Sequence, residues 1–271
     1  MSYTNRLALH WRDSKTEVAT DDRRFAEAIA HIYGPFIKSR VHGDKPVSDV
    51  PPEETWTAVL DCQAHTYDDF DHAVLSFEYE IERRLLRDLK HGVLLHAGAV
   101  TNGERTYIFS GQSGAGKSTI TLDFVRRGYR YLTDEFVALS VDGAWLYPFP
   151  RAATVKRHWP HAKPGELLEL NEEYDYRGFF ATASGNDMSP VPLENAAIVF
   201  LERSPDEEPD VRILEHRERL AQLLCSTFEL VGRESDVWPA ISTVAATVRA
   251  CKLRYRDCES DLNLALEVLE Q

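Results

Sequence analysis

One run of residues points most directly to chemistry, because it fits the phosphate-binding pattern G-x-x-x-x-G-K-[ST] at every fixed position. Glycines let such a loop turn its backbone N–H groups around phosphate oxygens, and the following helix presents its positive end to the same anion. Lys117 can reach the β- and γ-phosphates, and the Ser118 hydroxyl can ligate Mg²⁺. The sequence therefore predicts a P-loop for ATP with Mg²⁺, formed by Gly111, Ser113, Gly114, Ala115, Gly116, Lys117, Ser118 and Thr119.

Two adjacent acids, Asp134 and Glu135, follow the strand that is expected to return directly after the P-loop helix. At the end of that strand they would point toward the metal and the γ-phosphate. One acid can hold the metal, and the other can accept a proton from an attacking hydroxyl. The alternative is a pair of loop acids that cap a turn.

His96 lies in an apolar run just before the P-loop. A lone histidine in such a strand is ordinarily a hydrogen-bonded core residue, but here it could abut the phosphate pocket and tune an acid. Arg151, Lys156 and Arg157 follow further along the chain. They form either a solvated basic loop or a clamp for the transferring phosphate or an acidic substrate.

The elements that must position these residues can be read from hydrophobic periodicity and turn residues. A strand over 93–100 and a return strand over 106–109 flank the hairpin turn Asn102-Gly103. The P-loop helix is expected over 117–127, followed by strands at 129–132, 136–141 and 145–147. Later elements are a strand at 196–201, helices at 219–229 and 236–250, a strand at 253–256 and a helix at 261–269.

The first part of the chain reads as a small α+β region, with a strand at 7–11, a helix over 21–33 capped by Asp21 or Asp22, a strand at 57–64 and a helix at 77–89. A loop is expected at 43–54. Strands often follow one another without a helix between them, so the class is α/β without the strict alternation of a doubly wound sheet. We expect an N-terminal α+β region at 1–90 and a catalytic P-loop domain at 91–271.

Composition narrows the classes of partner. The net charge of −13 argues against nucleic acid and against an anionic membrane surface. Neither a signal peptide nor an apolar run long enough for a membrane span is recognisable, which predicts a cytoplasmic protein. The four cysteines form no CxxC pair, and we expect reduced, mostly buried thiols.

Three segments together resemble the catalytic domain of HPr kinase/phosphorylase and its relatives, which include lasso-peptide kinases. They are HAGAV at His96–Val100, GQSGAGKST at Gly111–Thr119 and YRYLTDEFVAL at Tyr129–Leu139. Looser similarity continues through YPFPR, AIVFLER and CKLRY, so that the resemblance covers roughly 93 to 271. The first 90 residues do not resemble the N-terminal domain of HPr kinase, and YRGFF at Tyr176–Phe180 is a distant echo of its arginine-containing motif.

The resemblance implies a P-loop domain of the HPr kinase and phosphoenolpyruvate carboxykinase type that phosphorylates a serine hydroxyl. It implies Asp134 as the catalytic base, assisted by His96, and Glu135 as a metal-side acid where HPr kinase has a second Asp. The expected function is an ATP-dependent kinase acting on a serine of a peptide or protein. There are two alternatives: a kinase whose acceptor is a small-molecule alcohol, and a nucleotide-binding regulatory module with little turnover. The chain could also form a homo-oligomer.

Overall fold

The computed structural model describes residues 3–41, 56–87, 92–155, 162–170, 177–182, 187–228, 234–256 and 258–270. Within these ranges the chain is mixed α/β, as predicted. It forms two compact units, Met1–Lys90 with Thr154–Asn186, and His91–Ala153 with Asp187–Gln271. The first unit thus includes a segment assigned above to the second domain, while the division into independent domains stays a prediction. The expected loop at 43–54, Lys156 and Arg157 lie outside the described residues.

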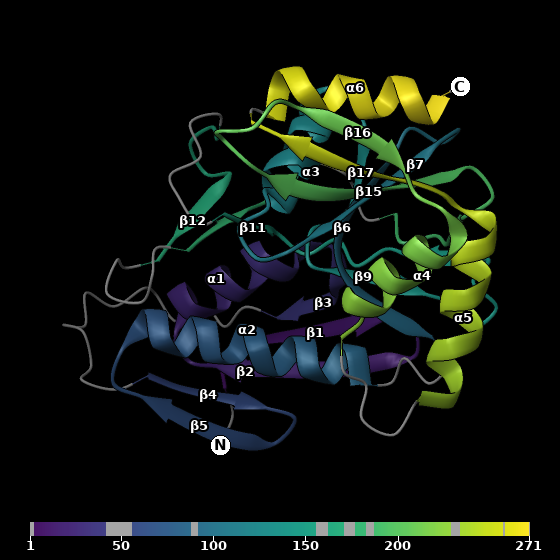
Figure 1. Ribbon diagram of the computed structural model, residues 1–271. Helices are drawn as coiled ribbons and strands as arrows, with labels where there is room; N and C mark the ends of the chain where they lie inside the picture. Colours follow the sequence, from purple (N-terminus) through teal and green to yellow (C-terminus); the bar gives the residue numbers. More distant parts are fainter. Residues whose placement is uncertain are drawn as a thin grey trace. The chain divides into compact units, whose positions relative to one another are not determined.

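The first unit is built on a five-stranded antiparallel sheet with helices α1 (Arg23–Tyr33) and α2 (Phe70–Arg87) packed on one face (Figure 1). Alternate residues are buried along the strand Asn5–Trp11, as with Leu7, Leu9 and Trp11. α1 begins at the predicted cap Asp22, whose carboxylate accepts a hydrogen bond from the Phe25 N–H at 3.0 Å, and ends at the short 3-10 turn η1 (Gly34–Phe36). The strand order is β3 (Ile37–Val41), β1 (Asn5–Trp11), β2 (Ser14–Thr20), β4 (Trp56–Leu60) and β5 (Gln63–Tyr67).

The prediction of a single strand over 57–64 is wrong. The chain reverses at Asp61 and Cys62, which both have positive φ angles of 48° and 70°, and a hairpin of β4 and β5 results. The Asp61 carboxylate accepts hydrogen bonds from the Thr16 hydroxyl at 2.9 Å and from Arg84 Nε at 3.1 Å. Contacts with distant residues therefore hold a turn that lacks the usual glycine or asparagine.

A small sheet of three strands completes the first unit and was not predicted. Its order is β11 (Ala153–Val155), β13 (Gly178–Phe180) and β12 (Leu167–Glu169). The His31 ring nitrogen Nε2 lies 2.7 Å from the carbonyl oxygen of Phe179, which ties α1 to β13. Strands this short show no periodicity that could be recognised in the sequence.

The second unit contains a mixed sheet that is nine-stranded within the described residues. Three strands, β7 (Thr106–Gly111), β15 (Ala196–Arg203) and β17 (Arg249–Tyr255), are parallel, and the other pairings are antiparallel, as the adjacent strand pairs in the sequence suggest. β8 (Arg130–Thr133) pairs with β6 (Val93–Thr101) beside the main path. The main path runs through β14 (Val191–Pro192), β10 (Trp145–Tyr147), β9 (Phe136–Leu139), β6 (Val93–Thr101), β7 (Thr106–Gly111), β15 (Ala196–Arg203), β17 (Arg249–Tyr255) and β16 (Asp210–Ile213).

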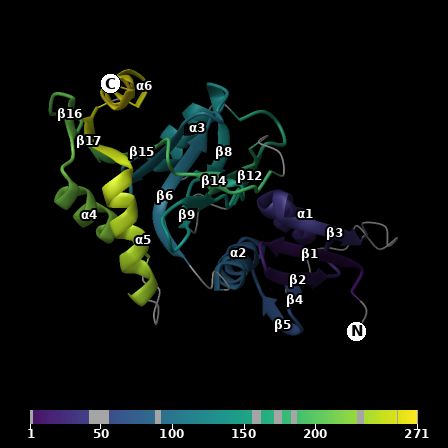
Figure 2. The same cartoon turned by 90° about the vertical axis from the view of Figure 1, so that its right-hand side faces the viewer.

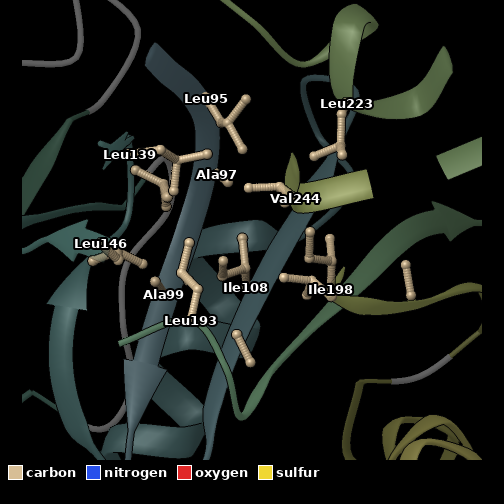
Figure 3. Close-up of a cluster of buried hydrophobic side chains, with 14 of the residues drawn as sticks. Leu95, Ala97, Ala99, Ile108, Leu139, Leu146, Leu193, Ile198, Leu223 and Val244 are labelled. Atoms are coloured by element: carbon tan, nitrogen blue, oxygen red, sulfur yellow. The ribbon is translucent and has the colours of Figure 1, made fainter. Parts of the chain in front are cut away.

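Helices cover both faces of this sheet. α3 (Lys117–Arg126) and α6 (Cys258–Glu270) share one apolar cluster with it, while α4 (His216–Cys225) and α5 (Glu234–Thr247) lie on the opposite face (Figure 2). Figure 3 shows Leu223 of α4 and Val244 of α5 directed toward residues of the central strands. Leu95 and Ala97 of β6 point into that cluster, so the intervening His96 points to the face that carries α3.

Two further expectations can be compared with the structure. Of the cysteines whose side chains are described, Cys251 is buried but Cys62 and Cys225 are exposed, so the prediction of mostly buried thiols is wrong. In the described part of the chain, no helix is both long and apolar enough to cross a bilayer.

Candidate functional site

The glycine-rich loop, residues 111–119, joins the end of β7 to the start of α3. Gly114 and Gly116 have φ angles of 82° and 84°, a left-handed conformation that favours glycine, and Gly116 caps α3. The side chain of Lys117 is buried, and its ammonium donates to the carbonyl oxygens of Gly111 at 3.0 Å and Gln112 at 3.2 Å. The lysine therefore closes the loop on itself, with a helix N-terminus directly beside it.

Two parallel strands support the loop. A Cβ atom on Gly111 would lie 2.7 Å from the carbonyl oxygen of Leu201, so β15 passes too close for any other residue. Tyr255, the last residue of β17, is fully buried and donates its hydroxyl to the carbonyl oxygen of Ala115 at 2.5 Å. The loop is thus tied to strands that lie far along the chain.

The acid pair connects two strands that share one edge of β6. β9 pairs with the first half of β6 and β8 with its last residues, which places Asp134 and Glu135 beside the middle of that strand. The N–H of Ala97 donates to the carbonyl oxygen of Glu135 at 3.2 Å. Thr133 is the residue that stabilises the turn, since its hydroxyl oxygen accepts from the Phe136 N–H at 3.2 Å.

The two acids have different environments. Asp134 is 1% exposed, and its carboxylate accepts a hydrogen bond from the Tyr131 hydroxyl at 2.9 Å. Glu135 is partly exposed, and its carboxylate lies 3.1 Å from the His96 ring nitrogen Nε2. One acid is therefore enclosed and held by a phenol, while the other is paired with a histidine and reaches solvent.

Gly98 is the place where the glycine-rich loop's helix meets the acid pair. A Cβ atom added there would lie 2.1 Å from Thr121 Oγ1 of α3 and 3.7 Å from the Cα atom of Asp134. The same Thr121 hydroxyl donates to the carbonyl oxygen of Lys117 at 2.9 Å. The absence of a side chain at position 98 lets α3 pack directly against β6, the strand beside which the acids lie.

Positively charged groups act on Glu135. Burial raises the pKa of Glu135, but the hydrogen bond from His96 and the charges of Arg151, His96 and Lys117 together lower it below its usual value. Burial and the neighbouring Asp134 raise the pKa of Tyr131 well above its usual value, so the phenol stays protonated and can donate. Arg151 is buried and donates to the carbonyl oxygen of Ala152 at 2.9 Å.

No family model matches the chain, and no curated protein matches its sequence. A solved structure, the HPr(Ser) kinase/phosphatase from Coxiella burnetii, is a distant neighbour. The similarity covers 65% of this chain and 91% of that one, with 12% identity and a TM-score of 0.30. A TM-score this low does not show that the two proteins belong to one family.

The structure brings most of the predicted site residues into one place in the second unit. His96, Lys117, Asp134 and Glu135 gather around β6 and the start of α3, and the charge of Arg151 acts on Glu135. Ser118 lies on the first turn of α3 and is half-buried. The Arg177-Gly178 pair and the described part of the YRGFF segment belong to the first unit.

The alternative readings of single residues can be judged from these contacts. In the turn that holds the acids, the Thr133 hydroxyl oxygen accepts hydrogen bonds from the Glu135 and Phe136 N–H groups. His96 is not an enclosed core histidine, since its side chain is 36% exposed and paired with Glu135. Its ring also lies 5.2 Å from the ring of Phe228, centroid to centroid.

Tyr131, Tyr255 and Phe228 were not predicted as site residues from the sequence. Tyr131 carried a weak signal, because it lies three residues before Asp134 in a strand whose end was expected at the site. Phe228 gave no signal, since its segment is brought to β6 by contacts between distant residues. The His96 N–H donates to the Ser226 carbonyl at 2.7 Å, and the Phe228 N–H donates to the Leu94 carbonyl at 2.9 Å. Nothing in the local sequence indicates such a pairing.

Proposed function

We propose that the chain is an ATP-dependent phosphotransferase, with a P-loop domain of the HPr kinase and phosphoenolpyruvate carboxykinase type. It would transfer the γ-phosphate to a hydroxyl group, with a serine of a peptide or protein as the expected acceptor and a small-molecule alcohol as the alternative. One observation carries the proposal. At Gly98 the helix that follows the glycine-rich loop contacts the strand connection that holds a buried aspartate, and the loop's lysine acts electrostatically on the neighbouring glutamate.

The residues of the loop suit a nucleotide with Mg²⁺. A Cβ atom on Gly114 would meet nothing within 4 Å, so the loop is open where the backbone is left-handed. Within the described ranges no three His, Cys, Asp or Glu side chains gather as a metal site of their own. A magnesium ion would therefore depend on the nucleotide's phosphates for most of its ligands, with Ser118 and Glu135 contributing one oxygen each.

The chain's own groups fit the requirements of phosphoryl transfer. Bound ATP with Mg²⁺ would supply the phosphoryl group and a bridging positive charge. Asp134 would accept the proton of the acceptor hydroxyl. The hydroxyl oxygen would then bond to the γ-phosphorus while the bond from that phosphorus to ADP breaks. The Tyr131 hydroxyl fixes the orientation of that carboxylate, and Lys117 and Arg151 place positive charge where negative charge would develop.

Replacement of Asp134 by Asn tests the proposal. The substitution keeps the size of the side chain and an oxygen that can accept from Tyr131, but it removes the base. We expect phosphate transfer from labelled ATP to fall by about 10²–10⁴-fold, the usual contribution of a general base, while the Kd for ATP changes by less than about threefold. Asp206→Asn, in an exposed loop of the same unit, is the matched control and should retain full transfer.

The acceptor is best sought among peptides encoded near the gene, with the phosphorylated residue mapped by mass spectrometry. A phosphoserine on one peptide would establish the class of substrate, and labelling of an alcohol metabolite would favour the small-molecule alternative. If the wild-type chain binds ATP but transfers phosphate to none of these acceptors, the regulatory nucleotide-binding module becomes the better account. Equal transfer by wild type and Asp134→Asn would contradict the assigned base.

A further inference from the structure

We propose that Tyr255 is a positioning residue that holds the glycine-rich loop in its phosphate-binding form before the nucleotide arrives. It would do so by fixing the peptide between Ala115 and Gly116, so that the Gly116 N–H is directed toward the ligand. The inference rests on the nucleotide binding proposed above and adds a residue 140 positions away in the sequence.

The contact has the properties of a constraint. The Tyr255 hydroxyl and the Ala115 carbonyl oxygen are 2.5 Å apart, which is a short hydrogen bond between neutral groups. The tyrosine has no exposed surface, and it belongs to the apolar cluster that also contains Ala115, Ile120 and Leu262. Water is therefore excluded, and a carbonyl deprived of this donor would stay buried without compensation.

Peptide geometry converts this contact into an effect on the ligand side. A trans peptide is planar, and its C=O and N–H groups point in opposite directions. The described part of the chain contains no cis peptide bond. Because the Ala115 carbonyl is held toward β17 and the apolar cluster, the Gly116 N–H must point away from them. The Gly116 N–H therefore points out of the core, toward the same side as the positive N-terminal end of α3.

The surrounding residues leave the loop few other conformations. Lys117 holds the carbonyls of Gly111 and Gln112 at its start, and β15 blocks any side chain on Gly111. Gly114 and Gly116, in contrast, have backbones that rotate freely when nothing restrains them. Tyr255 thus restrains the flexible half of the loop together with the hydrogen bond from the Ala115 N–H to the Gln112 carbonyl oxygen at 3.1 Å. Lys117 must exchange its carbonyl partners for phosphate when a nucleotide binds.

Removal of one oxygen atom by Tyr255→Phe tests the inference. The matched control is Tyr33→Phe in the first unit, because Tyr33 is also fully buried and donates its hydroxyl to a backbone carbonyl, that of Glu78, at 2.8 Å. Urea unfolding of both variants verifies that they fold and that they lose comparable stability. Differences between them then report on the loop and not on a generally weakened protein.

Two measurements decide the outcome. Hydrogen exchange of the nucleotide-free protein should show amides 112–118 exchanging about tenfold faster in Tyr255→Phe, with no change in Tyr33→Phe. Calorimetric titration with Mg²⁺-ATP and Mg²⁺-ADP should show about tenfold weaker binding only in Tyr255→Phe, as expected for the loss of one buried hydrogen bond.

Unaltered loop exchange in Tyr255→Phe would overturn the inference, as would equal weakening of nucleotide binding by Tyr33→Phe. A wild-type chain that binds no nucleotide would instead refute the proposed function together with the ligand-directed role of Tyr255. A wild-type chain that binds ATP but transfers nothing would refute only the kinase assignment, and the exchange and affinity comparisons would still decide the role of Tyr255.

Discussion

Replacing Gly98 by Ala should separate the helix that follows the glycine-rich loop from the acid pair. The new Cβ atom would stand 2.1 Å from Thr121 Oγ1, whereas real Cβ contacts are not shorter than 3.0 Å and ordinary contact begins at 3.4 Å. The strand and α3 must therefore move apart by about 0.9 to 1.3 Å, or Thr121 must rotate and abandon the Lys117 carbonyl. Gly98 has no unusual backbone conformation, so the clash alone determines the effect.

The size of the effect follows from this displacement. Forcing a methyl group into a packed interior costs about 1–3 kcal/mol of unfolding free energy. A displacement of about 1 Å between reacting groups can reduce a rate by about 10²-fold. We therefore expect Gly98→Ala to fold with reduced stability, to lose about 10²-fold in the rate of phosphate transfer, and to change its affinity for ATP much less.

A double-mutant cycle measured by urea unfolding tests this reasoning. Thr121→Ala removes the clashing oxygen and leaves the Thr121 Cβ at 3.3 Å from the new methyl, so it should restore about 1–2 kcal/mol to Gly98→Ala. Gly34→Ala is the control, because a Cβ atom there would meet nothing within 4 Å. Wild-type stability and transfer rate in Gly98→Ala, or additive effects in the cycle, would refute the close approach of α3 to β6.

Three further outcomes follow from the contacts of the site. Lys117→Met removes a charged partner of the phosphates and should weaken Mg²⁺-ATP binding by about 10- to 100-fold in calorimetry; an unchanged Kd would contradict the loop assignment. Tyr131→Phe deprives the Asp134 carboxylate of its phenol donor at 2.9 Å and should slow transfer by about tenfold with ATP affinity retained, whereas a matching loss of affinity would indicate general damage. Glu135 has a folded-state pKa below its usual value. Its ionised form therefore stabilises the fold above the usual pKa, and this contribution disappears as the pH falls through the folded-state pKa. The difference in unfolding free energy between wild type and Glu135→Gln should therefore be largest near neutral pH and shrink in acid, and a pH-independent difference would argue against the lowered pKa.

The parts of the fold that could be predicted from sequence are those with strong local patterns. The hairpin at Asn102-Gly103 and the strand-loop-helix around Lys117 have turn residues and periodicity that specify them within a few residues. The acid pair could be assigned to the site because it directly follows the short strand expected after the P-loop helix, and that strand must end near the loop. The helix at Asp22 could be predicted because its cap is local.

The remaining features depend on contacts between distant residues. The turn at Asp61 and Cys62 contains no glycine, asparagine or proline and is held by Thr16 and Arg84. The predicted helix over 236–250 and strand at 253–256 were wrong at their boundary, because α5 ends at Thr247 and β17 begins at Arg249. Residues 249–252 join the sheet through parallel pairing with β15, and the local sequence contains no pattern that predicts this pairing.

The parallel pairing that supports the glycine-rich loop has a consequence for protein synthesis. β7 leads into the loop, but its neighbour β15 comes much later in the sequence, since Thr106 of β7 pairs with Ala196 of β15. β17 follows later still. A ribosome therefore delivers the complete motif long before it delivers the strands on which the loop rests. Because distant pairings form slowly, the loop is among the last parts of this unit to acquire its shape. A fragment that stops before residue 249 would carry every residue of the motif and still lack the β17 strand that holds the loop.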